Sequence, residues 1–202
     1  MRRIIVVLIV LVLSAIAFIP SATAAEAPTL STQDRTTLKA LGIKIAVPTY
    51  VPTGYTVRKV EVEPCPEGSP LSPKGTCRFG PTYSIAYRNA VAKDSCFFAV
   101  RATGGGIGGP SGEYRTPPVS TRLLGDVAAL FGKSDNSAKV PSAAQLNSPQ
   151  PGLMTDWGSE DGGKSGPFYR VIGHPVEPAP ECQNTITPNE VIKIMQSLTW
   201  LK

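Results

Sequence analysis

Hydrophobic positions in this chain fall into one long N-terminal run and, after it, many short stretches. The run extends from Ile4 to Ile19 without a charged residue, whereas the later apolar stretches are broken by most of the chain's 20 prolines and 19 glycines. Scattered proline and glycine favour many short strands joined by turns over long helices.

Two of the later stretches alternate between apolar and polar residues, as half-buried strands do. The alternation predicts an antiparallel pair joined by a polar turn. The positions on its apolar face are Tyr83, Ile85 and Tyr87 in the first segment and Cys96, Phe98 and Val100 in the second.

Weaker strand patterns precede and follow this pair. Prolines 48 and 52 and Gly54 turn the chain between the first two of them. Asp161-Gly162-Gly163 has hairpin chemistry and joins the last two. The predicted strands are residues 43–47, 55–63 with one bulge, 115–121, 126–131, 153–157 and 168–172.

Capping signals predict two helices. Ser31 opens a capping box for a short helix that ends at Gly42. Near the C-terminus, Thr187 at N-cap, Pro188 at N1 and Glu190 at N3 form the strongest helix start in the chain. The side chains expected to face the sheet are Val191, Ile192, Met195 and Leu198.

Together these elements predict an α+β fold, with a curved antiparallel sheet, a short N-terminal helix and a C-terminal helix packed on it. Residues 25–202 are long enough for one domain with a substantial core. Within that domain, residues 132–151 are rich in polar residues, small residues and proline, which predicts an exposed, flexible loop.

The N-terminal run has the form of a secretory signal peptide over residues 1–24. Arg2 and Arg3 precede it, and Ala22-Thr23-Ala24 supplies the small residues that signal peptidase requires. The run is shorter than the roughly 20 residues of a membrane-spanning helix, which favours cleavage over a retained anchor. We therefore expect export to the periplasm, a thylakoid lumen or the medium, with no stable membrane anchor after cleavage.

The charge of the chain argues against polyanionic partners. The formal net charge of +5 falls to +3 when Arg2 and Arg3 are removed with the signal. So small an excess is too weak to indicate nucleic-acid binding or an anionic membrane surface.

Four cysteines, Cys65, Cys77, Cys96 and Cys182, form an even set in a chain expected to be exported, so disulfides are the default. Three pairings are possible. Cys65 and Cys77 bracket one loop rich in proline and glycine, so we pair them with each other and Cys96 with Cys182. Loop closure gives the short bridge about 3 kcal/mol and the long one about 4–5 kcal/mol. The spacings do not match a metal site, and no metal is expected.

Two glycine-rich strings imitate nucleotide-binding motifs. Residues 158–165 match GxxxxGKS, and Gly104, Gly106 and Gly109 match GxGxxG. Neither string is followed by a helix whose amides could hold phosphate, so no nucleotide cofactor is expected. The second string is either a turn with positive φ angles or a partner-binding loop. This loop consists of Gly104, Gly105, Gly106, Ile107, Gly108 and Gly109.

Candidate catalytic residues are few. His174 is the only histidine, and no GxSxG elbow accompanies it, so a solvated or capping role is expected. Of the carboxylates Asp156, Glu160 and Asp161, two fall in the hairpin tip, where water keeps their acidity ordinary. The tyrosines at 50, 55, 83, 87 and 169 form either a sugar-stacking face or half-buried core edges, with the core favoured.

Several motifs together resemble a bacterial extracytoplasmic domain of unknown function. They are the PxxxPxGY turn at 48–55, the YxIxYR strand at 83–88, the CFFAV strand, the strands with Trp157 and Tyr169, and the final PxE helix ending in Ser-Leu. The resemblance covers about residues 38–201. The chain is similar in particular to uncharacterised exported proteins of cyanobacteria. The resemblance also relates it to the outer domains of anti-sigma-like proteins. The resemblance implies fold and compartment, and it supplies no catalytic residues.

The expected function is a non-enzymatic binding or accessory module of the cell envelope. Its partner would be an envelope protein or a small ligand. The alternatives are a small envelope hydrolase and a carrier of an apolar ligand. A cleft joining His174 to a buried carboxylate would favour the hydrolase, and an apolar cavity between sheet and helix would favour the carrier.

Export leads to the first testable prediction. Protein isolated from its native host should begin at Ala25, within a residue or two, because the small residues before it match the cleavage site. N-terminal sequencing of the purified protein checks this. An envelope-bound form that still begins at Met1 would contradict it.

Overall fold

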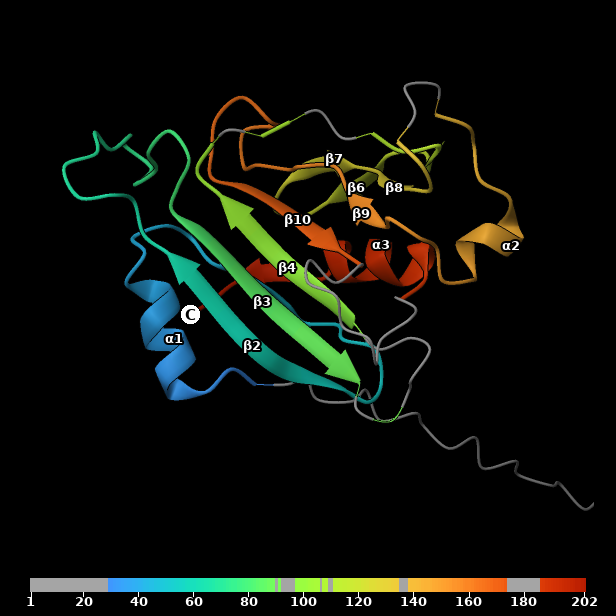
Figure 1. Cartoon of the computed structure of the whole chain (residues 1–202), viewed down its shortest axis with the longest axis horizontal. Coiled ribbons are helices and arrows are strands. Elements are labelled where there is room, and N and C mark those ends of the chain that lie inside the picture. The colour runs from blue at the N-terminus through green and yellow to red at the C-terminus, as the bar shows by residue number, and fades with distance from the viewer. Residues whose placement is uncertain are drawn as a thin grey trace, which may run out of the picture.

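The computed structural model describes residues 29–89, 91, 97–105, 107–108, 111–134, 138–173 and 186–202. At its centre is a seven-stranded sheet in the order β2-β3-β4-β10-β9-β8-β5 (Figure 1), and every neighbouring pair is antiparallel. The α+β class and the antiparallel sheet are therefore confirmed. The strands are β2 (Tyr55–Glu63), β3 (Thr82–Asn89), β4 (Phe97–Thr103), β5 (Tyr114–Arg115), β8 (Ala129–Phe131), β9 (Met154–Thr155) and β10 (Phe168–Ile172).

The long strands match the sequence patterns closely. β2 has its predicted bulge, where the register with β3 shifts between Val57 and Lys59. β9 is shorter than expected, because only two of residues 153–157 are in the strand, although Gly158 still bridges to Tyr169.

The segments 115–121 and 126–131 each divide in two. β6 (Val119–Thr121) and β7 (Gly125–Val127) form a separate two-stranded sheet, while β5 and β8 join the large one. Pro117 and Pro118 separate β5 from β6, since neither residue offers the N–H group that a continuous strand needs.

The predicted N-terminal helix is present as α1 (Thr32–Lys39). The Ser31 hydroxyl accepts the Asp34 N–H at 3.1 Å and donates to the Asp34 carboxylate at 2.6 Å. The N-cap is thus confirmed, but the predicted capping box is incomplete, because the Asp34 carboxylate contacts the Ser31 hydroxyl instead of the Ser31 N–H. Gly42 follows the helix at a φ of 70°, which suits glycine.

The strand predicted at residues 43–47 lies further along, as β1 (Ala46–Pro48), and it includes a proline. Its partner is β11 (Leu198–Trp200), a strand that the sequence did not predict. Pro48 is tolerated because β1 belongs to a two-stranded ribbon and needs hydrogen bonds on one side only.

The C-terminal helix, α3 (Pro188–Gln196), has the predicted capping box. The Thr187 hydroxyl accepts the Glu190 N–H at 3.2 Å, and the Glu190 carboxylate accepts the Thr187 N–H at 2.8 Å. Val191 and Met195 are fully buried as expected. Leu198 is buried too, although it lies in β11 after the helix. Ile192 is only partly buried and Ile194 is fully buried in its place, so the prediction was wrong for Ile192 alone.

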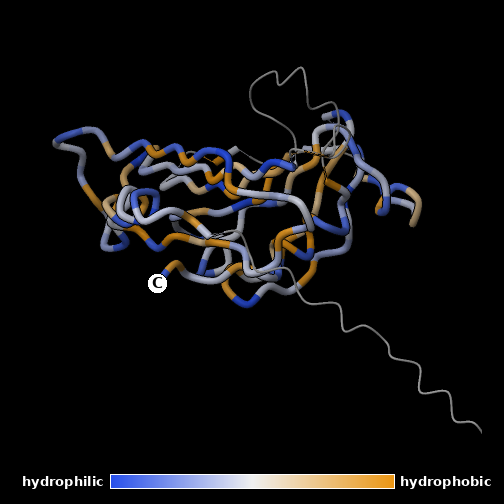
Figure 2. Tube along the Cα trace, turned by 90° about the horizontal axis from the view of Figure 1, so that it is seen from below, coloured by the Kyte–Doolittle hydropathy of each residue, from blue (hydrophilic) through white to orange (hydrophobic). Residues whose placement is uncertain are grey.

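The core lies on one face of the large sheet, where the alternating positions of β3 and β4 converge. Tyr83, Ile85, Tyr87, Phe98 and Val100 are buried there and belong to one hydrophobic cluster with residues of α1 and α3. The rings of Tyr87 and Phe98 stack with centroids 4.5 Å apart. Figure 2 shows hydrophobic and hydrophilic positions alternating along extended segments. Burial is not confined to the core face, because Ala99, Phe168 and Ile172 are buried on the opposite face.

The loop at residues 132–151 contains a helix that the sequence analysis missed. α2 (Ala143–Leu146) begins with a complete capping box between Ser142 and Gln145 and buries none of its own side chains. The signal was the Ser-x-x-Gln spacing. The flexibility of the loop stays a prediction.

Cys65 and Cys77 form the predicted disulfide, with their Cα atoms 6.0 Å apart. Cys96, Cys182 and the signal peptide lie outside the described residues. The second bridge and the cleavage site therefore stay predictions.

The capping box of α3 leads to the second prediction. Thr187→Ala should lower the free energy of unfolding by about 1 kcal/mol, because the Glu190 N–H loses its acceptor. For a chain of this size that corresponds to a fall in melting temperature of roughly 2–4 °C. Thr187→Ser keeps the hydroxyl and is the matched control. Equal melting temperatures for the Ala and Ser variants would contradict the role of the cap.

Candidate functional site

Three loops meet at one end of the large sheet. Glu63, Thr82, Thr103 and Phe168 lie in a single row across β2, β3, β4 and β10. Because the strands are antiparallel, the connections that leave this row all emerge at the same end (Figure 1). We call the exposed side of this region the three-loop surface. It consists of the cystine loop (64–81), the described part of the glycine loop (104–105 and 107–108) and the β9–β10 loop (156–167).

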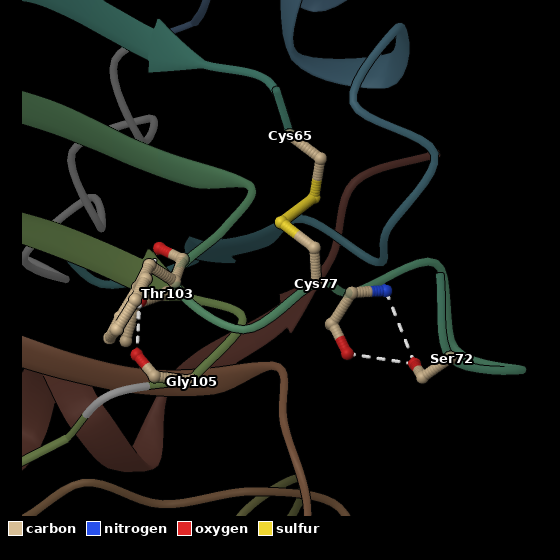
Figure 3. The surroundings of a disulfide bond; sticks show 7 residues. Cys65, Ser72, Cys77, Thr103 and Gly105 are labelled. Atoms are coloured by element: carbon tan, nitrogen blue, oxygen red, sulfur yellow. Dashed lines mark hydrogen bonds between the residues drawn. A yellow bond between two sulfur atoms is a disulfide. The ribbon is translucent and has the colours of Figure 1, made fainter. Parts of the chain in front are cut away.

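The cystine loop is fixed by more than its disulfide. The Ser72 N–H donates to the Thr76 carbonyl at 2.7 Å, and the two hydroxyls lie 2.7 Å apart. The Cys77 N–H donates to the Gly80 carbonyl at 2.8 Å. Figure 3 shows Ser72 and the disulfide beside Thr103, whose hydroxyl donates to the Gly105 carbonyl at 2.9 Å. The Gly104 N–H donates to the Pro81 carbonyl at 3.1 Å, so the cystine and glycine loops are in direct contact.

Gly104 and Gly105 are required by this contact. A Cβ atom on Gly104 would lie 1.6 Å from the Gly80 carbonyl oxygen, and one on Gly105 would lie 2.6 Å from that of Arg78. A Cβ atom on Gly166, in the β9–β10 loop, would lie 2.0 Å from the Gly104 oxygen. The three backbones therefore approach too closely for any side chain.

This close approach, and not a turn with positive φ angles, explains why Gly104 and Gly105 are glycines. Gly104, Gly105 and Gly108 do not have positive φ angles, so a left-handed turn does not explain them. Gly106 and Gly109 lie outside the described residues. Gly104 and Gly105 pack against the chain itself, whereas a Cβ atom on Gly108 would contact nothing within 4 Å. Of the described glycine-loop residues, Ile107 and Gly108 are therefore the exposed ones, and partner binding by this loop stays a prediction.

Apolar side chains are exposed on the three-loop surface. Phe79 is 64% exposed and Leu71 is 62% exposed, both in the cystine loop, and Ile107 of the glycine loop is 37% exposed. The Arg78 guanidinium lies 5.0 Å from the centre of the Phe79 ring. The sequence analysis missed Leu71 and Phe79, although an apolar residue in a loop rich in proline and glycine was the available signal.

The GxxxxGKS string of the β9–β10 loop holds its own carboxylate instead of a phosphate. Asp161 accepts hydrogen bonds from the hydroxyls of Ser159 and Ser165 at 2.6 and 2.5 Å and from the N–H groups of Lys164 and Ser165 at 3.1 and 3.2 Å. Lys74 of the cystine loop adds an ion pair at 3.0 Å. The hydrogen bonds from Ser159, Ser165 and Lys74 hold the pKa of Asp161 well below its usual range, so the prediction of ordinary acidity was wrong for this carboxylate.

An open cleft of about 560 Å³ lies beside this network. Its charged groups are paired, since Lys44 contacts Glu160 at 2.6 Å and Lys74 contacts Asp161. Lys44 also lies 5.4 Å from the centre of the Trp200 ring. The arrangement offers polar contacts but no unpaired acid or base. The lining residues are Gly42, Ile43, Lys44, Ser72, Pro73, Lys74, Gly75, Glu160 and Pro167.

The tyrosines belong mainly to the core and do not form a sugar-binding face. Tyr55, Tyr83, Tyr87 and Tyr169 are buried, and only Tyr50 is exposed. Burial raises the pKa of Tyr83, Tyr87 and Tyr169, so all three stay protonated at neutral pH. The core alternative is confirmed for these four residues.

The remaining candidates that the structure describes are not brought into one site. His174 lies outside the described residues. Asp156 is not in the hairpin tip; burial raises its pKa, and the ion pair with Arg115 at 2.6 Å partly offsets that effect. Across the described ranges, no group of three or more His, Cys, Asp or Glu side chains is suited to hold a metal ion.

The contact between the loops leads to the third prediction. Gly104→Ala should destabilise the protein by about 1–3 kcal/mol or more, because the new methyl group overlaps the Gly80 carbonyl. Gly108→Ala, in the same loop, should leave the melting temperature almost unchanged, since the added methyl group meets open space. Thermal unfolding of both variants tests this, and equal melting temperatures would refute the close approach.

The described part of the chain contains no helix long and apolar enough to span a bilayer. Comparison of the chain with protein-family models, with curated proteins and with solved structures found no match. The resemblance to extracytoplasmic domains therefore stays a prediction.

Proposed function

We propose that this chain is an exported, non-enzymatic binding or accessory module of the cell envelope, and that its three-loop surface docks a protein partner. One observation carries the proposal: three segments far apart in sequence meet at one end of the sheet and expose Leu71, Phe79 and Ile107. Binding residues commonly lie on loops that a rigid scaffold positions.

The base of the three-loop surface is preorganised. The Cys65–Cys77 disulfide and the close packing of Gly104 on Gly80 restrict the loops before any partner arrives. Preorganisation lowers the entropy lost on association. The pairing of Phe79 with Arg78 adds an aromatic ring and a guanidinium, the two kinds of group that contribute most at protein interfaces.

The alternatives have less support. A carrier needs an apolar cavity, whereas large side chains such as Tyr87, Phe98 and Met195 fill the described core. A hydrolase needs an available acid or base, but Glu160 and Asp161 are engaged with lysines.

Export is part of the proposal. A disulfide is typical of a non-reducing compartment, and the N-terminal run has the form of a signal peptide. The proposal also includes that this chain is related to the uncharacterised exported proteins of cyanobacteria that its motifs resemble.

Site-specific cross-linking tests the docking surface. A photoreactive phenylalanine analogue in place of Phe79 should capture one envelope protein in the native host, because this side chain projects from the three-loop surface. The same analogue in place of Val140, which is 78% exposed but lies outside that surface, is the matched control. Captured products are identified by mass spectrometry.

The expected result is an adduct formed at position 79, absent at position 140 and competed away by an excess of unlabelled wild-type protein. Adding Leu71→Asp should weaken the adduct at position 79, since it places a charge on the apolar surface. Identical products at both positions, or no product at position 79, would overturn the proposal.

A further inference from the structure

Two arginines lie side by side on the face of the large sheet opposite the core. Arg101 on β4 is directly paired with Arg170 on β10 in the antiparallel register. Their strand neighbours Val100 and Val171 belong to the core cluster, so the two arginines project from the other face. Directly opposed side chains have Cβ atoms about 4.5–5.5 Å apart, and like charges at that position destabilise a sheet.

The charge of this pair is not balanced by the part of the chain that the structure describes. No described carboxylate lies within ion-pair distance of Arg101 or Arg170. The nearby acids form ion pairs with other residues. The Oδ2 atom of Asp156 contacts Arg115 at 2.6 Å, while its Oδ1 atom is buried without a described partner, and Glu61, opposite Ser84 on β2, contacts Lys59 at 2.5 Å. Among the described residues, the arginine pair therefore has no carboxylate as a direct partner.

Arg170 is held in place and stays charged. Its guanidinium stacks over the Trp157 ring, 4.1 Å from the centre, and contacts the sulfur of Met154 at 3.6 Å. Its Nε atom is buried without a described partner. Burial, and then the charge of Arg101, lowers the pKa of Arg170 to about 10, so the group is still protonated at neutral pH.

The neighbours of Arg101 differ in exposure between its own row and the next. Ser84 on β3 is directly opposite Arg101 and adds a hydroxyl donor in the same row. The next row holds Ala86, Ala99 and Ile172, of which Ala99 and Ile172 are buried. Arg101, Arg170 and Ser84 are all partly exposed, so a ligand can reach the row from solvent.

We propose that Arg101, Arg170 and Ser84 bind a doubly charged tetrahedral oxyanion, a phosphate or sulfate group. Guanidinium groups match such oxyanions with paired hydrogen bonds, and two of them balance two negative charges. A carboxylate has one charge and leaves half of the pair unbalanced. The group could be a free ion or part of a larger ligand. The inference rests on the sheet residues alone and does not depend on docking at the three-loop surface.

Calorimetric titration of the exported chain, residues 25–202, tests the site. Sodium sulfate, sodium phosphate, glycerol phosphate and sodium acetate are titrated in dilute chloride buffer of matched ionic strength. Sulfate and phosphate should bind at least about tenfold more tightly than acetate. Arg101→Gln should weaken their binding at least about tenfold, while Arg58→Gln, which removes an exposed charge at the β2 bulge, should change it less than about twofold.

Thermal unfolding supplies a second readout that a structural role would move in the opposite direction. In chloride, Arg101→Gln should raise the melting temperature, because it removes the repulsion from Arg170. Sulfate should raise the melting temperature of the wild-type protein more than that of the variant, because its general stabilising effect is common to both and only the wild type binds it.

Each outcome decides the proposal. A lower melting temperature for Arg101→Gln in chloride would show that Arg101 stabilises the fold without a ligand, and would overturn the proposal. Absence of sulfate and phosphate binding, or an equal loss in Arg58→Gln, would also overturn it. Glycerol phosphate binding as tightly as phosphate would support a site for an attached group, and weaker binding would support a site for the free ion.

Discussion

Two buried tyrosine hydroxyls join the two main parts of this fold. The Tyr83 hydroxyl accepts the Ala46 N–H at 2.8 Å and donates to the Ala46 carbonyl at 3.2 Å. The Tyr169 hydroxyl donates to the Lys44 carbonyl at 2.8 Å. Both rings stand on the core face of the large sheet, and both partners lie in or just before β1. Since a buried hydroxyl without a partner is costly, these bonds fix how the β1–β11 ribbon sits on the large sheet. The closed core between them depends on that placement.

The same placement positions the loops. With β1 held against the core, the segment that precedes it runs past the cystine loop, where a Cβ atom on Gly75 would lie 2.7 Å from the Gly42 carbonyl. Lys44 then reaches Glu160 of the β9–β10 loop. The three-loop surface is thus supported from below by the N-terminal segment as well as by the disulfide. A surface held by a disulfide and by close backbone contacts is suited to present its side chains in a constant arrangement.

Polar groups are satisfied differently in different parts of the molecule. On the core face of the sheet, hydroxyls form hydrogen bonds with backbone groups. At the loop end of the sheet, Asp161 accepts hydrogen bonds from hydroxyls and amides and pairs with Lys74, so its charge is balanced within the molecule. Arg101 and Arg170 are the contrast, because the described chain places two like charges together without a counter-charge. Perturbed charged groups of this kind are concentrated at functional sites, which is the basis of the proposed oxyanion site.

The sequence by itself determined the elements whose signals are local. Alternation placed Tyr83, Ile85 and Tyr87 on one face, the Thr187 box began α3, and the short cysteine spacing identified the Cys65–Cys77 bridge. Each depends on residues close together in the chain, so periodicity, capping or loop closure suffices.

Only the tertiary structure decided which distant segments meet. The pairing of β1 with β11, the packing of Gly104 on Gly80 and the opposition of Arg101 and Arg170 all depend on strand order and register. Glycine strings and single arginines look alike in sequence whether they form turns, close contacts or sites. The distinction comes from the backbone that lies opposite, and that is set by long-range pairing which no local pattern encodes.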